Sequence, residues 1–165
     1  MPVRRYRPSW PARTKVLAAL VGLSTMAGAH AQQIVLSNTR GLDFGRFVAG
    51  TGGTITIGPT GARSRTGGVV LLNSPAAGQA SFNLGKSSNG GNNKAVIISL
   101  PANGSVRLTS GANSMAVNTF VNNPASITAV PNGGATLSVG ATLTVAPNQP
   151  AGNYAGSFPL IVNFQ

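Results

Sequence analysis

The chain has 165 residues, with 12 Lys or Arg residues against one acid, one His and no Cys. The absence of Cys excludes a disulfide scaffold. The shortage of acids and His excludes general acid–base chemistry, paired-carboxylate hydrolysis, and zinc or calcium sites. We therefore expect neither an enzyme nor a bound cofactor.

The first 31 residues have the three parts of a secretory signal peptide. Five basic residues lie between positions 4 and 15, an apolar run begins at Val16, and Ala29-His30-Ala31 is a small-x-small cleavage site. The apolar run is shorter than the roughly 20 residues that a membrane-spanning helix needs. We expect cleavage after Ala31, a single mature domain over 32–165, and export through the inner membrane to the periplasm and then to the cell surface or medium.

Removal of the signal peptide lowers the charge of the chain. Seven basic residues then remain against Asp43, which gives a net charge of +6. These cations are scattered and the aromatic residues fall at inward-facing positions, so no nucleic-acid interface is expected. The charge suits adhesion to an anionic surface polysaccharide. Asp43 itself is expected at a turn or a strand edge.

The mature chain begins with short alternating apolar segments separated by turn residues, a pattern typical of an all-β sandwich. Residues 34–36 form either a first strand or a free arm. The apolar phase then changes at Gly45, which suggests a β-bulge. Ile55 and Ile57 face inward from the next strand, and residues 59–65 are expected to form a loop.

The middle of the chain predicts buried strands. The apolar run 69–72 predicts a strand covered on both faces, and segment 79–84 alternates with Phe82 and Leu84 inward. Segment 95–100 is the most β-prone and predicts a central strand. Asn103-Gly104 predicts a hairpin turn into a return strand, and segments 86–93 and 132–134 read as a loop and a turn.

The next two segments differ in how regularly their apolar and polar residues alternate. Met115 and Val117 share a face, and Phe120 breaks the pattern. Every second residue from Ala135 to Val145 is apolar over eleven positions. This predicts one long strand that bends at Gly140 to serve both sheets.

The C-terminal residues alternate between an apolar and a polar face. The apolar face consists of the even-numbered residues Tyr154, Phe158, Leu160, Val162 and Phe164. Gly152 is the fourteenth residue from the end and Phe164 is penultimate. This combination resembles the terminal zipper of bacterial fimbrial subunits that a periplasmic chaperone and an outer-membrane usher assemble. The plain alternative is an ordinary last strand of a β-sandwich.

A second resemblance covers nearly the whole mature chain. It rests on Leu42-Asp43-Phe44-Gly45, Phe47-Val48-Ala49-Gly50-Thr51-Gly52-Gly53, Ser138-Val139-Gly140-Ala141-Thr142-Leu143-Thr144-Val145 and Gly152-Asn153-Tyr154-Ala155-Gly156-Ser157-Phe158. These segments resemble an uncharacterised family of exported Gram-negative domains, itself similar to the common-pilus (Mat/Ecp) major subunit and to spore coat U-type proteins. The resemblance implies an immunoglobulin-like, pilin-like antiparallel β-sandwich at the cell surface. The absence of Cys departs from fimbrial subunits, which often carry one disulfide.

Two functions follow as hypotheses. In the first, the chain is a fimbrial subunit that identical subunits complete by β-strand addition. Gly152, Tyr154, Phe158, Leu160, Val162 and Phe164 would then form the subunit and chaperone interface, and Ile34, Val35 and Leu36 the donor arm. In the second, the sandwich is complete by itself and binds a polysaccharide or matrix ligand without polymerising. The arm is short, and Pro159 within the terminal strand would remove one ladder bond.

Overall fold

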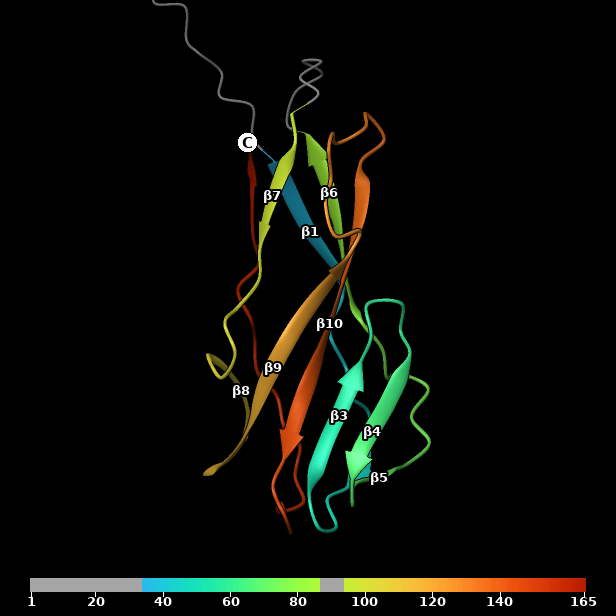
Figure 1. Cartoon of the computed structure of the whole chain (residues 1–165), viewed down its shortest axis with the longest axis vertical. Coiled ribbons are helices and arrows are strands. Elements are labelled where there is room, and N and C mark those ends of the chain that lie inside the picture. The colour runs from blue at the N-terminus through green and yellow to red at the C-terminus, as the bar shows by residue number, and fades with distance from the viewer. Residues whose placement is uncertain (1–33, 87–93) are drawn as a thin grey trace, which may run out of the picture. The chain divides into compact units, whose positions relative to one another are not determined.

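The computed structural model describes residues 34–86 and 94–165, which fall in one compact unit. The predicted cleavage residues Ala29 and Ala31, and most of the predicted loop 86–93, lie outside the described residues. The described residues form strands and turns, and all of the strand pairs are antiparallel. No helix in this part of the chain is long and apolar enough to cross a membrane. The prediction of an all-β chain is confirmed (Figure 1).

The described ranges contain eleven strands, in three sheets. They are β1 (Ile34–Arg40), β2 (Phe47–Val48), β3 (Gly53–Ile57), β4 (Arg63–Gly67), β5 (Val70–Leu71), β6 (Ala80–Lys86), β7 (Val96–Ser99), β8 (Val106–Ser110), β9 (Asn113–Asn123), β10 (Ala135–Val145) and β11 (Ile161–Phe164).

The largest sheet is organised around β10, and it is strongly curled, like half a barrel. One edge of β10 pairs with β9, and its other edge pairs first with β6 and then with β3 (Figure 1). β1 extends the sheet beyond β6, β4 extends it beyond β3, and β8 extends it beyond β9. The predicted strand 135–145 is confirmed, although its three neighbours all belong to one sheet and it does not serve two sheets.

Gly140 lies where β10 changes partner from β6 to β3. A Cβ atom at this position would overlap the Ile57 carbonyl oxygen at the end of β3. The absence of a side chain therefore lets β3 begin its pairing directly after β6 ends.

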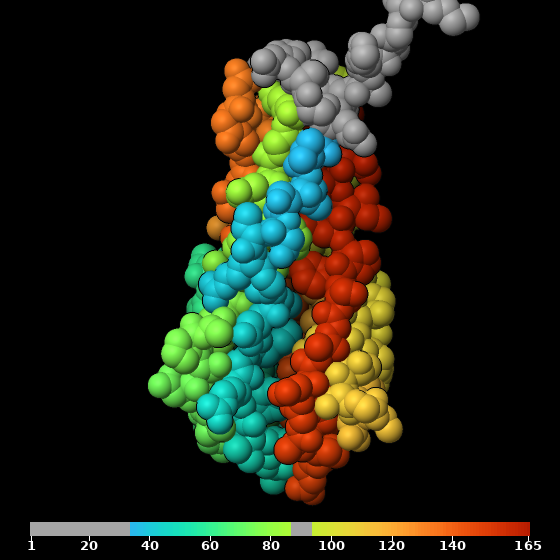
Figure 2. Space-filling model, turned by 180° about the vertical axis from the view of Figure 1, so that it is seen from behind, coloured from blue at the N-terminus to red at the C-terminus, as the bar shows by residue number. Residues whose placement is uncertain are grey.

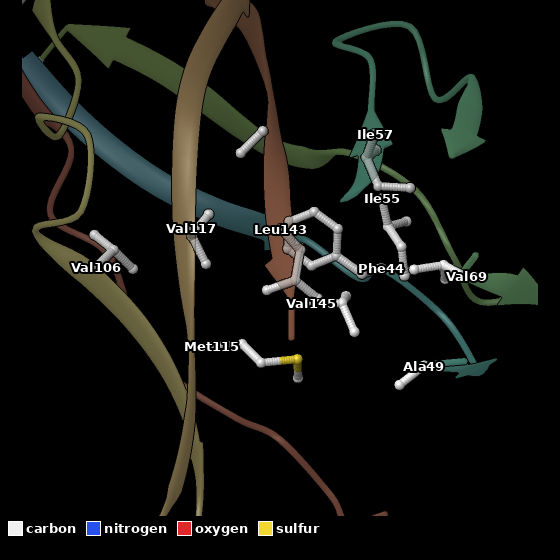
Figure 3. Packing of buried hydrophobic residues seen from close by; sticks show 11 residues of the cluster. Phe44, Ala49, Ile55, Ile57, Val69, Val106, Met115, Val117, Leu143 and Val145 are labelled. Atoms are coloured by element: carbon white, nitrogen blue, oxygen red, sulfur yellow. The ribbon is translucent and has the colours of Figure 1, made fainter. Parts of the chain in front are cut away.

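The apolar faces of the strands form two core clusters. The β3–β10 cluster is built mainly from β3, β9 and the second half of β10, and it includes the side chains drawn in Figure 3: Phe44, Ala49, Ile55, Ile57, Val69, Val106, Met115, Val117, Ala141, Leu143 and Val145. The β6–β10 cluster contains Ala80, Phe82, Leu84, Val96, Ile127, Val130, Leu137 and Val139. Each fully buried Val, Leu or Ile contributes about 1.5–3 kcal/mol, so these two clusters carry most of the hydrophobic stabilisation.

Two predictions about the segment 59–72 are wrong in part. The predicted loop 59–65 is correct over 59–62, but residues 63–67 form β4. Both faces of β4 are largely exposed where it pairs with β3, so its sequence shows no apolar alternation. The run 69–72 is covered on one face only. Val69 is fully buried, whereas Val70 and Leu72 are 51% and 39% exposed.

The structure also differs from the predicted central strand over 95–100 and from the predicted hairpin at Asn103-Gly104. β7 pairs with β11 in a two-stranded sheet, and beyond that it makes one bridge, from Val96 to Ile127. Residues 102–105 do form a turn, with the Ser105 nitrogen donating to the Ala102 oxygen at 3.2 Å. β8 then pairs with β9 rather than with β7, so this turn joins two sheets and is not a hairpin.

The sequence predicted a break in the apolar alternation at Phe120 and a β-bulge at Gly45. The structure confirms the first of these predictions and not the second. At Phe120 the break is confirmed as a bulge: Asn118 opposes Thr142 and Val121 opposes Gly140, so two residues of β9 face one of β10. At Gly45 the chain turns with a φ of 72° outside any paired strand, so the predicted bulge there is wrong.

Candidate interface between the N-terminal and C-terminal edge segments

The C-terminal edge segment, residues 149–165, keeps the predicted alternation. Its even-numbered apolar residues are half buried and the odd-numbered residues between them are exposed. The paired part is shorter than expected, because β11 begins at Ile161. Pro159 therefore precedes the strand, and the expected loss of a ladder bond within β11 does not occur.

Aromatic side chains anchor this segment to both core clusters. Phe158 packs against both, with its ring centroid 6.2 Å from that of Phe82 and 5.2 Å from that of Phe120. The Tyr154 hydroxyl donates to the Pro150 oxygen at 2.8 Å and accepts from Gln149 Nε2 at 2.9 Å. The segment is thus fixed at its corner and its middle by its inward side chains.

The structure gives a physical reason for the glycine at position 152, which its distance from the C-terminus in the sequence did not supply. A Cβ atom there would overlap Ser110 Oγ at the end of β8. Gly152 therefore allows the corner before Tyr154 to approach β8 closely.

One backbone edge of the C-terminal edge segment is paired. Ala155 exchanges two backbone hydrogen bonds with Thr109, at 2.8 and 3.0 Å, and β11 pairs with β7. The N-terminal edge segment, residues 34–49, is also paired on one side. β1 pairs with β6, Asp43 bridges to Gly78, and β2 pairs with β5.

The other edges of these two segments face each other. Figure 2 shows the two segments side by side, and β1 lies next to β11. No ladder joins them in the described residues, and the backbone bond found nearest this strip, from the Asn148 nitrogen to the Gly50 oxygen at 3.0 Å, lies just beyond its end. We call the strip between these two edges the open seam.

The open seam widens into a groove of about 1140 Å³ between residues 40–49 and 149–156. Leu108, Met115 and Leu143 from the core line it, and polar side chains such as Arg40 and Gln149 also contribute. An extended chain placed here would meet a mixture of apolar and polar side chains, with the backbone edges of the two segments on either side. Known cases of β-strand addition use a free backbone edge together with contacts to alternate side chains of the added strand.

The predicted interface residues divide between the two ends of the open seam. Gly152 and Tyr154 line the groove. Phe158, Leu160, Val162 and Phe164 do not line it, and they pack into the core near β1. Sequence reasoning missed the opposite wall, 40–49, because that segment is too irregular to show a periodic pattern.

The predicted donor arm is paired within its own chain. Ile34, Val35 and Leu36 lie in β1, opposite Lys86, Gly85 and Leu84 of β6. Ile34 and Leu36 face the β6–β10 cluster, and Val35 is 52% exposed.

Charged residues beside the groove hold the backbone in place. Arg63 donates to the Leu72 and Arg46 oxygens at 2.9 and 2.8 Å, and Arg40 donates to the Ala76 and Ala77 oxygens. Burial lowers the pKa of the Arg63 guanidinium, and the Asp43 carboxylate acts in the opposite direction. Asp43 Oδ1 accepts from the Gly45 nitrogen at 2.6 Å, so the prediction of a turn role for Asp43 is confirmed.

Residues 34–86 and 94–165 contain no group of three or more His, Cys, Asp or Glu side chains that could hold a metal ion.

Comparison with known proteins gives one match. The model of a family described as "Domain of unknown function (DUF4402)" matches residues 34–164. No curated protein and no solved structure matches the chain.

Proposed function

We propose that this chain, which belongs to the DUF4402 family of domains of unknown function, is an exported structural subunit of a surface fibre that assembles by β-strand addition. The observation that carries the proposal is the open seam, where two backbone edges without ladder partners in the described residues run beside each other along a groove lined by apolar and polar side chains. Unpaired strand edges are templates for pairing with another chain.

The strand order supports an immunoglobulin-like sandwich that lacks one strand. In that fold, strands A, B, E and D form one sheet and strands C, F and G the other. Here β1, β6, β10 and β9 follow one another in the order A-B-E-D, and β7 and β11 pair as C and F. In the described residues no strand occupies the G position beside β11.

The corner before β11 supports the same assignment. Immunoglobulin-like domains carry a Tyr near the start of strand F whose hydroxyl bonds to backbone a few residues upstream. Tyr154 makes this contact with the Pro150 oxygen. An added strand beside β11 would complete the second sheet, with alternate apolar side chains reaching the groove.

Amide hydrogen exchange tests the proposal. Backbone amides of 40–49 and 150–164 that face the open seam should exchange slowly in the surface-extracted assembly and faster in the isolated subunit. The Ala155 amide serves as an internal control, because it already donates to Thr109. Equal exchange at the seam in both samples would contradict strand addition.

A second candidate is the self-complete sandwich, and the pairing of β1 with β6 favours it. The arm that would be donated is not free in the single chain. This candidate expects a stable monomer that binds an anionic surface polysaccharide and shows no change at the open seam.

The proposed role is structural rather than catalytic, in line with one acid, one His and no Cys in the whole chain. The partners that we propose are identical subunits, with a periplasmic chaperone and an outer-membrane usher during export. A domain with an unpaired strand edge needs such cover in transit, because an uncovered edge is a template for aggregation.

A further inference from the structure

The outer face of the β2–β5 pair gathers exposed apolar side chains. Val48 and Val70 lie opposite each other in this pair and are 53% and 51% exposed. The pairing continues to Arg46 and Leu72, since the Leu72 nitrogen donates to the Arg46 oxygen at 2.9 Å, and Leu72 is 39% exposed. Successive side chains of a strand point to opposite faces, so these four share one face. We call this surface, formed by Arg46, Val48, Val70 and Leu72, the ribbon face.

The other face of the β2–β5 pair packs on the core. Phe47 and Leu71, which oppose each other, lie against the β3–β10 cluster. Three of the seven large apolar side chains that are exposed in the described residues therefore fall on the ribbon face. Single exposed apolar residues are ordinary, whereas a contiguous group beside polar residues marks an interaction surface.

Positive charge surrounds the ribbon face. Arg46 belongs to it, and the Arg63 guanidinium donates to the Arg46 and Leu72 oxygens at 2.8 and 2.9 Å. Arg40 lines the adjoining groove together with Arg46. The single acid of the chain, Asp43, offsets one of these three cations. The local charge is therefore positive, and a complementary partner is anionic.

Size and charge together indicate the class of partner. Three apolar side chains on a two-stranded ribbon are too few for a stable protein interface, which takes roughly 20–30 residues a side. A second copy would bring another basic face against this one. A polysaccharide offers no apolar phase for the valines. An anionic lipid surface accepts aliphatic side chains below its headgroups and attracts basic residues to them, without a matching shape.

We propose that the ribbon face docks this protein on an anionic lipid membrane, with Val48, Val70 and Leu72 among the lipids and Arg46 at the headgroups. This inference goes beyond the proposed function and does not depend on strand addition. The apolar and the basic side chains add to the same binding equilibrium, so removal of either kind should weaken it.

Sedimentation with lipid vesicles tests the inference on the isolated exported protein. It should bind vesicles of phosphatidylcholine mixed with phosphatidylglycerol about tenfold or more tightly than vesicles of phosphatidylcholine alone. Val48→Ser/Val70→Ser should weaken binding to the mixed vesicles about tenfold, because the lipid then buries less apolar surface. Arg46→Gln should weaken it about fivefold and make it less sensitive to salt.

Two matched controls separate the ribbon face from the rest of the surface. Ile97→Ser/Ile161→Ser removes two side chains that are 49% and 54% exposed on the β7–β11 pair. Arg107→Gln removes one charge from β8, which lies on the opposite side of Figure 1 from β5. Both controls should bind like the wild type. Arg40 and Arg63 are left unchanged, because they also hold backbone carbonyl groups.

Other occupants of the ribbon face give different results, and each of these results overturns the inference. Equal binding to both kinds of vesicle, or equal losses in the controls, means that the face is not a specific lipid contact. If Arg46→Gln alone weakens binding and polygalacturonate competes, the ligand is an anionic polysaccharide. If size-exclusion chromatography without vesicles shows a dimer that Val48→Ser/Val70→Ser dissociates, the occupant is a second copy.

Discussion

Single glycines decide where the backbones of this fold can approach each other, and Gly140 is the clearest case. Its missing Cβ leaves room for the Ile57 carbonyl oxygen at the point where β10 exchanges β6 for β3. The sequence analysis predicted a bend at Gly140, within the long apolar alternation of residues 135–145. It did not predict which neighbour comes close.

We expect Gly140→Ala to lower the free energy of unfolding by about 1–3 kcal/mol, since the added methyl group must displace the end of β3. Urea unfolding followed by circular dichroism measures this change. Gly133→Ala is the matched control, because a Cβ atom there meets nothing within 4 Å. A loss of stability in the control as large as in Gly140→Ala would contradict the explanation.

At the scale of the element, periodic burial explains which strands were predictable. β10 was predicted with its observed bounds because one face is buried over eleven residues. β4 was missed because neither face is covered, so its Arg, Ser and Thr residues resemble a loop. The apolar run around β5 was overestimated, because four consecutive apolar residues suggest two covered faces where the structure covers one.

Two neighbouring valines test this reading of β5. Val69 is fully buried and Val70 is 51% exposed. Val69→Ala should lower the free energy of unfolding by up to about 1.5–3 kcal/mol, the value of burying a whole Val side chain. Val70→Ala should change it by less than about 0.5 kcal/mol. Thermal or urea unfolding of both variants measures these changes in the free energy of unfolding. Equal losses of stability would mean that both faces of the run 69–72 are covered.

At the scale of the whole molecule, the least predictable feature was the open seam. Its two edges come from segments at least 100 positions apart in the sequence. Residues 40–49 are irregular and carry no alternation. The zipper of even-numbered residues correctly predicted the inward face of the C-terminal edge segment, but side-chain alternation does not report whether a backbone edge has a partner. That property depends on long-range pairing, which only the fold reveals.

Strand addition at the open seam is the central claim, and electrophoresis of the surface-extracted protein tests it most directly. Continuous backbone pairing over buried apolar side chains should resist detergent until heat separates the strands. We expect a ladder in the unheated lane and one band near the mass of the mature chain in the heated lane. A single monomer band in both lanes would contradict the account and leave the self-complete sandwich as the better description.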